Sequence, residues 1–117
     1  GTLERARQDS LTHAIIDEFD ATLWMAARHS FVLPEDKRIP EIKDSLRWEF
    51  ERAQDQFVPR MAEDGPYLMG EELTIPDILL AHCMGWAINA KFPVTEPFRA
   101  HTMRMRELPS FERASRA

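Results

Sequence analysis

Apolar positions repeat with a helical period through the opening part of the chain. The segment from Leu3 to about Ser30 contains neither glycine nor proline. Within it, apolar side chains recur at three- and four-residue intervals, the period of one helix face. These side chains belong to Leu11, Ile15, Ile16, Phe19, Leu23, Met25 and Ala26. The pattern predicts one long helix that ends before Leu33-Pro34, because the residue before a proline disfavours helical backbone.

A second helical pattern follows a loop from Leu33 to Pro40. It predicts a helix from about Glu41 to Phe57, and its apolar stripe consists of Ile42, Leu46, Phe50 and Phe57. Pro59 should kink or end this helix, since proline removes a helical hydrogen bond. A further turn over residues 60–63 and a tight turn at residues 64–66 are expected next.

The strongest local signal lies at Thr74 and Asp77. Thr74 can cap a helix with its hydroxyl, and the Asp77 carboxylate can reach back to the backbone N–H of Thr74, which together form a capping box. Leu73 and Ile78 flank the box as a hydrophobic staple, and Pro76 falls in the first turn, where its missing N–H is harmless. Residues 78–87 are apolar on nearly every face. A helix of this kind, ending near residue 91, is expected at the centre of a domain.

Two shorter helices complete the expected fold. One is predicted from Glu96 or Pro97 to Leu108, with Phe98, Met103 and Met105 turned inward. A last short helix begins at Pro109. No strand-like alternation or internal repeat interrupts this pattern. The expected fold is therefore all-α: about five helices in one domain, residues 1–117, packed around the helix that starts at Thr74.

Composition and charge narrow the class of protein. A chain of 117 residues with 44% hydrophobic residues can bury a core in one domain. Its net charge of −5 argues against a nucleic-acid partner. The chain has one cysteine, Cys83, so no intrachain disulfide can form, and no signal peptide or membrane-length apolar run is visible. We expect a protein of the reducing cytoplasm, with no membrane partner.

Three motifs in order resemble one family. Residues 67–77 read Tyr-Leu-Met-Gly, two acids, then Leu-Thr-Ile-Pro-Asp. This resembles the signature that opens the central helix in the C-terminal domain of cytosolic glutathione S-transferases, except that Pro76 stands where the family usually has alanine. Residues 4–11 and 109–114 resemble the first helix and the ending of the same domain, so the resemblance covers essentially the whole chain.

The resemblance implies a division of labour with a second domain. In the family, an N-terminal thioredoxin-like domain binds glutathione and supplies the catalytic residue. This chain shows no sequence pattern of a thioredoxin-like domain. We therefore assign it no catalytic residue and expect it to be a piece of a longer protein. The C-terminal domain of the family lines the pocket for a small hydrophobic electrophile and contributes to a homodimer. The chain alone is expected to be inactive in such detoxification chemistry.

The alternative, of a different class, is a non-catalytic protein–protein interaction module of the same fold.

Four residues match or adjoin positions that line the co-substrate pocket in bacterial relatives. In Glu18-Phe19-Asp20, Asp20 replaces a histidine of the family, which puts that contact in doubt and would favour a cationic or hydroxylated group. Trp24 and Arg28 follow on or near the same helix face and suit an apolar ligand with an acidic handle. Trp86 matches a pocket tryptophan. The competing interpretation is structural: Asp20 as a solvated acid, Trp24 and Trp86 as core, and Arg28 as a surface ion-pairing residue.

Other reactive side chains suggest no further site. His13, Asp17 and Asp20 could share a helix face, but no second cluster completes a metal site. His82 and Cys83 are adjacent, so they point to different sides of a helix and do not form a base–nucleophile pair. A buried, inert thiol is the expected state of Cys83. Asp77 is assigned to folding through its cap and not to catalysis.

Overall fold

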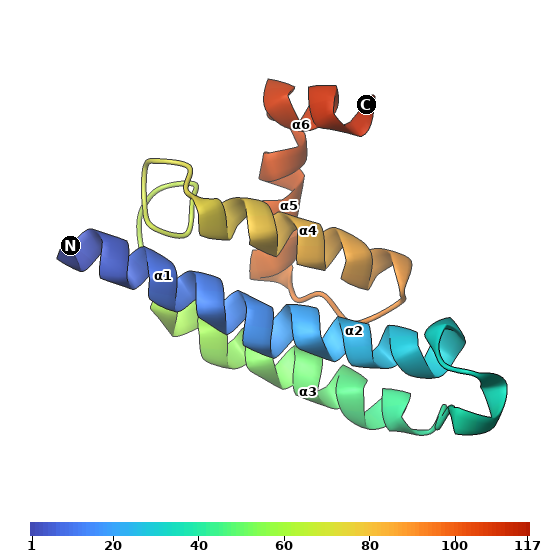
Figure 1. The fold of residues 1–117 in the computed structure, drawn as a ribbon. Helices are drawn as coiled ribbons and strands as arrows, with labels where there is room; N and C mark the ends of the chain where they lie inside the picture. The colour runs from blue at the N-terminus through green and yellow to red at the C-terminus, as the bar shows by residue number, and fades with distance from the viewer.

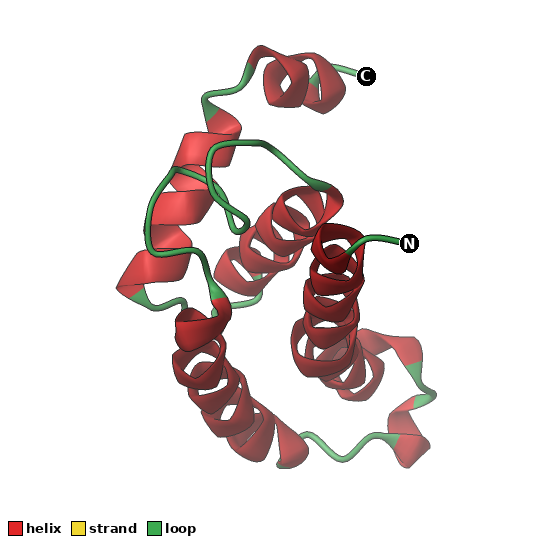
Figure 2. Cartoon of the chain, turned by 90° about the vertical axis from the view of Figure 1, so that its left-hand side faces the viewer, coloured by secondary structure: helices red, strands yellow, loops and turns green.

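The computed structural model describes all residues from Gly1 to Ala117. Helices joined by loops make up the chain, with no strand, as Figure 2 shows. The predicted all-α fold is confirmed. None of the helices combines the length and the apolar character needed to cross a bilayer.

The first helix runs without a break from Leu3 to Val32, so it ends immediately before Leu33-Pro34, as predicted. It consists of α1 (Leu3–Ile15), a π-helical turn η1 (Ile16–Asp20), α2 (Ala21–Ala27) and a second π-helical turn η2 (Arg28–Val32). The apolar positions explain the first of these turns. Leu11, Ile15, Phe19 and Leu23 are spaced by four and all are buried. Because an α-helix has about 3.6 residues per turn, such a row drifts around it, and the wider π turn keeps the row facing the core.

The second helix, α3 (Ile42–Phe57), runs antiparallel beside the first, as Figure 1 shows. A 3-10 turn, η3 (Glu35–Lys37), lies in the loop between them. Pro59 ends the helix, which passes into another 3-10 turn, η4 (Val58–Arg60). The extra turn expected over residues 60–63 is therefore placed slightly too late, and irregular chain begins at Met61.

The central helix, α4 (Ile75–Asn89), begins where the capping residues predict. The capping box is present, with the Thr74 N–H donating to the Asp77 carboxylate at 2.9 Å. The Thr74 hydroxyl donates to the same carboxylate oxygen at 3.2 Å. Leu80, Met84 and Ala87 have no exposed surface. The helix thus lies in the core, packed mainly against α1 and α5 (Glu96–Arg106).

The final helices differ in how far they join the core. In α5, Phe98 and Met105 are buried as predicted, but Met103 is 51% exposed, so its predicted inward position is wrong. Met103 and Met105 are two residues apart, which places them on different sides of a helix. The short α6 (Pro109–Ser115) buries no residue and lies beyond the rest of the bundle in Figure 1.

An aromatic cluster joins three helices at the middle of the core. Phe19 is fully buried, and its ring lies 5.4 Å from that of Phe50, 5.6 Å from that of Phe57 and 5.8 Å from that of Phe98. Tilted and edge-on ring pairs of this kind stabilise a core beyond the area they bury. The cluster ties the first helix to α3 and α5.

A buried glutamine connects α3 to the loop before α5. The Gln54 amide donates to the carbonyls of Phe50 at 3.1 Å and Pro93 at 2.8 Å, and its oxygen accepts from the Thr95 N–H at 2.8 Å and the Thr95 hydroxyl at 3.2 Å. Thr95 is the N-cap residue of α5. Gln54 therefore satisfies backbone groups where the chain turns into α5.

Replacing Gln54 with leucine should lower the free energy of unfolding by about 1–3 kcal/mol, because the Thr95 N–H and the Pro93 carbonyl lose their partner. Urea unfolding followed by circular dichroism measures the change. Gln56→Leu is the matched control, since Gln56 lies on the same helix but is exposed. Equal effects of the two substitutions would contradict the role assigned to Gln54.

Candidate functional site

The buried polar centre of the molecule lies around Asp77. Its Oδ1 accepts from the Leu68 N–H at 2.8 Å and contacts His101 Nε2 at 2.9 Å. Asp77, Leu68 and His101 have no exposed surface. An ionised carboxylate only accepts hydrogen bonds, so His101 must carry a proton on Nε2. This network holds together α4, α5 and the loop that precedes α4.

Ionisation of Asp77 is favoured by its partners. Burial raises the pKa of this carboxyl, but hydrogen bonds from His101, Leu68 and Thr74 together outweigh burial and hold it below the ordinary value of 3.8. The Asp77 side chain has no exposed surface, and all its acceptor contacts are internal. Its contacts suit a structural role, as the sequence predicts. The contribution of His101 was missed, because no local pattern marks a partner 24 residues away.

Three of the four predicted pocket residues lie together between the first helix and α4. The rings of Trp24 and Trp86 are 6.4 Å apart at 66°, and the Arg28 guanidinium lies 5.8 Å from the centre of the Trp24 ring. Trp24 is 42% exposed and Trp86 is half-buried. Neither tryptophan is therefore a fully enclosed core residue. Together with Arg28 they form an aromatic surface with one cation, which we call the tryptophan surface.

Asp20 lies one helical turn before Trp24 and is half-buried. It ends the π turn η1 and faces α4, where its charge acts on Cys83. Burial and this charge raise the pKa of the Cys83 thiol to about 12. Cys83 is 3% exposed and stays protonated at neutral pH, so it is an inert core thiol.

His82 extends the tryptophan surface along α4. Its ring lies 6.3 Å from the Trp86 ring, and the side chain is exposed. We assigned it no role from sequence, where it was considered only as a partner for Cys83. Its position one turn before Trp86 is the signal that could have placed it here.

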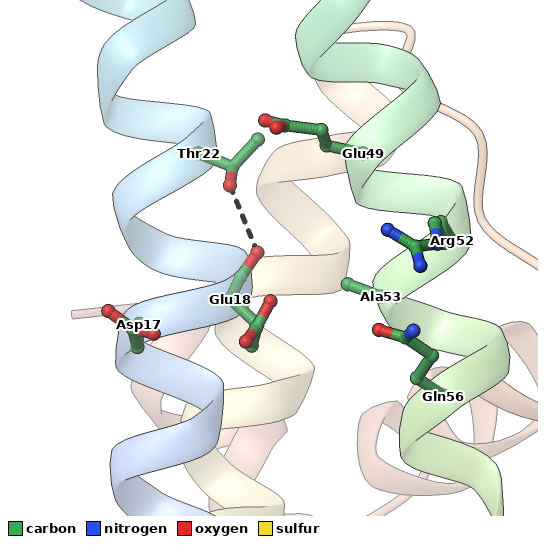
Figure 3. A pocket seen from close by; sticks show the side chains of 7 residues that line it. All are labelled: Asp17, Glu18, Thr22, Glu49, Arg52, Ala53 and Gln56. Carbon is green, nitrogen blue, oxygen red and sulfur yellow. Dashed lines mark hydrogen bonds between the residues drawn. The ribbon is translucent and has the colours of Figure 1, made fainter.

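A polar groove lies on another face, between the first helix and α3 (Figure 3). Its volume is about 230 Å³. One alanine lines it among polar and charged side chains, which are Asp17, Glu18, Thr22, Glu49, Arg52 and Gln56. The Thr22 hydroxyl donates to the Glu18 carbonyl, the contact drawn as a dashed line. The one hydroxyl in the groove, that of Thr22, is bonded to a backbone carbonyl and not to a carboxylate, so no nucleophile–base pair is formed here.

An apolar groove of about 360 Å³ separates α6 from α4 and α5. Leu73 and Ile78, the expected staple, are on one side, and Phe111 of α6 is on the other. His82 lines this groove as well as lying beside Trp86, so the groove continues toward the tryptophan surface.

No three histidine, cysteine, aspartate or glutamate side chains gather closely enough to hold a metal ion. His13, one of the candidates, has its Nδ1 2.8 Å from the Asp9 carbonyl. The tryptophan surface is therefore the arrangement with the clearest capacity to bind a ligand: two aromatic faces, one cation and one imidazole.

Comparisons of this chain with models of protein families, with curated proteins and with solved structures found no match.

Proposed function

We propose that this chain is the C-terminal helical domain of a glutathione transferase-like protein and forms one wall of its hydrophobic co-substrate site. A thioredoxin-like N-terminal domain of the parent protein would bind glutathione and hold the catalytic residue. The proposal includes a homodimer to which this domain contributes contacts. Three sequence motifs in family order support it, together with an all-α fold built around a capped central helix.

The observation that carries the proposal is the tryptophan surface. Trp24 and Arg28 come from the first helix and Trp86 comes from α4, and the three meet at a surface that is still partly open. Partly open aromatic rings bind flat apolar molecules, and a guanidinium adds affinity for an acidic group on them. A conjugate of glutathione with an aromatic electrophile has both features.

The tryptophan surface should bind the anionic aromatic probe 1-anilinonaphthalene-8-sulfonate. We expect Trp24→Ala to weaken binding about fivefold, since loss of an aromatic or cation–π contact of about 1 kcal/mol has that effect. A fluorescence titration measures the dissociation constant. Trp48→Ala is the matched control, because Trp48 is also exposed, at 62%. The guanidinium of Arg52 also lies 5.4 Å from the centre of the Trp48 ring. Equal loss in both variants would remove the support for this surface.

The identity of the parent protein has a direct test. The proposal expects the reading frame upstream of Gly1 to encode a thioredoxin-like sequence. It also expects this chain alone to pass through immobilised glutathione without retention, because the thiol site is assigned to the other domain. Tight retention, or an upstream frame of a different kind, would contradict the proposal.

A second function is favoured by the apolar groove beside α6. Leu73 and Ile78 are 41% and 54% exposed there, and Phe111 is 39% exposed. Open apolar surface of this kind is common where proteins associate. A non-catalytic interaction module would use this groove for a partner, and it would leave the tryptophan surface without a ligand. The probe titration with Trp24→Ala distinguishes the two functions.

A further inference from the structure

A separate hollow lies between α2, the start of α3 and the end of α4. Its volume is about 210 Å³. Apolar side chains make most of its wall, among them Leu23, Ala27, Phe31, Trp86, Ala90 and Phe92. Trp86 is the one residue that it shares with the tryptophan surface, and Trp24, Arg28 and Asp20 do not line it.

Small side chains explain why the helices leave space here. Ala26 and Ala27 of α2 and Ala90 at the end of α4 line the hollow together. Alanine brings one methyl group where a leucine or a phenylalanine would fill the gap between helices. The large rings of Phe31 and Trp86 form walls beside these alanines. The result is an open hollow between the helices and not a filled core.

Two cations line the same hollow without an acid. Lys43 and Arg47 belong to the first turns of α3, one turn apart, and both are half-buried. Lys43 forms no ion pair. Arg47 lies 5.4 Å from the centre of the Phe92 ring, and its contact with Asp44, 3.4 Å long, involves a carboxylate that is 94% exposed. The positive end of the α3 dipole adds to this field.

We propose that this hollow binds a small monocarboxylate with a single aromatic ring. The carboxylate would lie between Lys43 and Arg47, where a guanidinium can bind it through two parallel hydrogen bonds. The ring would lie against Ala27, Ala90 and Trp86. Its size fits, because an apolar cavity of about 150 Å³ accommodates benzene and this one has about 210 Å³.

Charge complementarity selects this class of ligand over others. The lining holds two positive groups and no negative one. A cationic ligand would therefore be repelled, and a neutral ligand would form no ion pair with Lys43 or Arg47. A long fatty acid would exceed the volume. The inference does not rest on the proposed function, since Lys43, Arg47 and the three alanines are not part of the tryptophan surface and Trp86 alone is shared.

The test is a nuclear magnetic resonance titration of the 15N-labelled chain with benzoate and, in parallel, with its uncharged analogue benzamide. We expect saturable shifts with benzoate at the amides of Ala26, Ala27, Ala90 and Phe92, and binding at least tenfold weaker with benzamide. Equal affinity for the two compounds, absence of saturable binding, or shifts centred on another surface would overturn the proposal.

Substitutions can test separately the contribution of the two cations and that of the hollow's volume to benzoate binding. Lys43→Met and Arg47→Gln should each weaken benzoate about tenfold, and Ala90→Phe should abolish binding by filling the hollow. Ala90 is exposed at the helix end, so the larger ring is compatible with folding. Arg52→Gln and Trp48→Ala change side chains of α3 that do not line the hollow, and both should bind benzoate unchanged. Weakening by either control equal to that of Lys43→Met would refute the site.

Discussion

Replacing Asp77 with alanine should lower the free energy of unfolding by about 3–5 kcal/mol, the range seen when one partner of a buried, hydrogen-bonded pair is removed. The substitution leaves the N–H groups of Leu68 and Thr74 and the Nε2–H of His101 without an acceptor. All three belong to segments that meet at the start of α4. The effect should therefore exceed the 0.5–2 kcal/mol, roughly, that an ordinary helix cap contributes.

Urea and thermal unfolding of Asp77→Ala measure this effect. Asp55→Ala is the matched control, since Asp55 is exposed on α3 and should change stability by less than about 0.5 kcal/mol. At a temperature where the variant is folded, its affinity for the naphthalene sulfonate probe should equal that of the original chain. Lost binding with unchanged stability would show that Asp77 serves a ligand and not the fold.

The same carboxylate makes stability depend on acid pH. The pKa of Asp77 in the folded chain lies below its ordinary value of 3.8, so the folded state binds this proton less readily than the unfolded state. Its stabilisation is then complete above about pH 4–5 and is lost as the pH falls through the folded pKa. In Asp77→Ala this part of the acid destabilisation should disappear. An unchanged slope of unfolding free energy against pH in the variant would contradict it.

Replacing Phe19 with alanine should cost about 3–5 kcal/mol, the range for removing a buried aromatic ring. Phe19 has no exposed surface and contacts the rings of Phe50, Phe57 and Phe98. Its loss opens a cavity where the first helix, α3 and α5 meet. Because the helices cannot collapse independently into that space, most of the penalty should persist.

Chemical unfolding of Phe19→Ala, with Phe19→Leu beside it, measures the penalty. Leucine keeps much of the side-chain volume and should cost less. Phe31→Ala is the matched control, since Phe31 is 68% exposed and should change stability by less than about 0.5 kcal/mol. A Phe19→Ala variant as stable as Phe31→Ala would mean that the aromatic cluster is not the centre of the core.

The candidate sites differ in how much of each could be predicted from the sequence. Trp24 and Arg28 lie one turn apart on one helix, so their proximity follows from helical spacing. That the Trp86 ring lies edge-on beside Trp24 depends on how α4 crosses the first helix. The hollow at Lys43 and Arg47 was not foreseen, because three alanines and two cations from different helices form no motif until the helices are packed.

The chain alone determined, to within about three residues, where its helices begin and end. The Thr74–Asp77 box, the prolines at residues 59, 76 and 109 and the apolar periods act within a few residues, so their effect can be read directly from order along the chain. Only the tertiary structure decided which groups distant in the sequence contact each other: His101 with Asp77, Gln54 with Thr95, and Trp86 with Trp24. Such partners satisfy buried polar groups or fill gaps, and that requirement arises only after packing has excluded water.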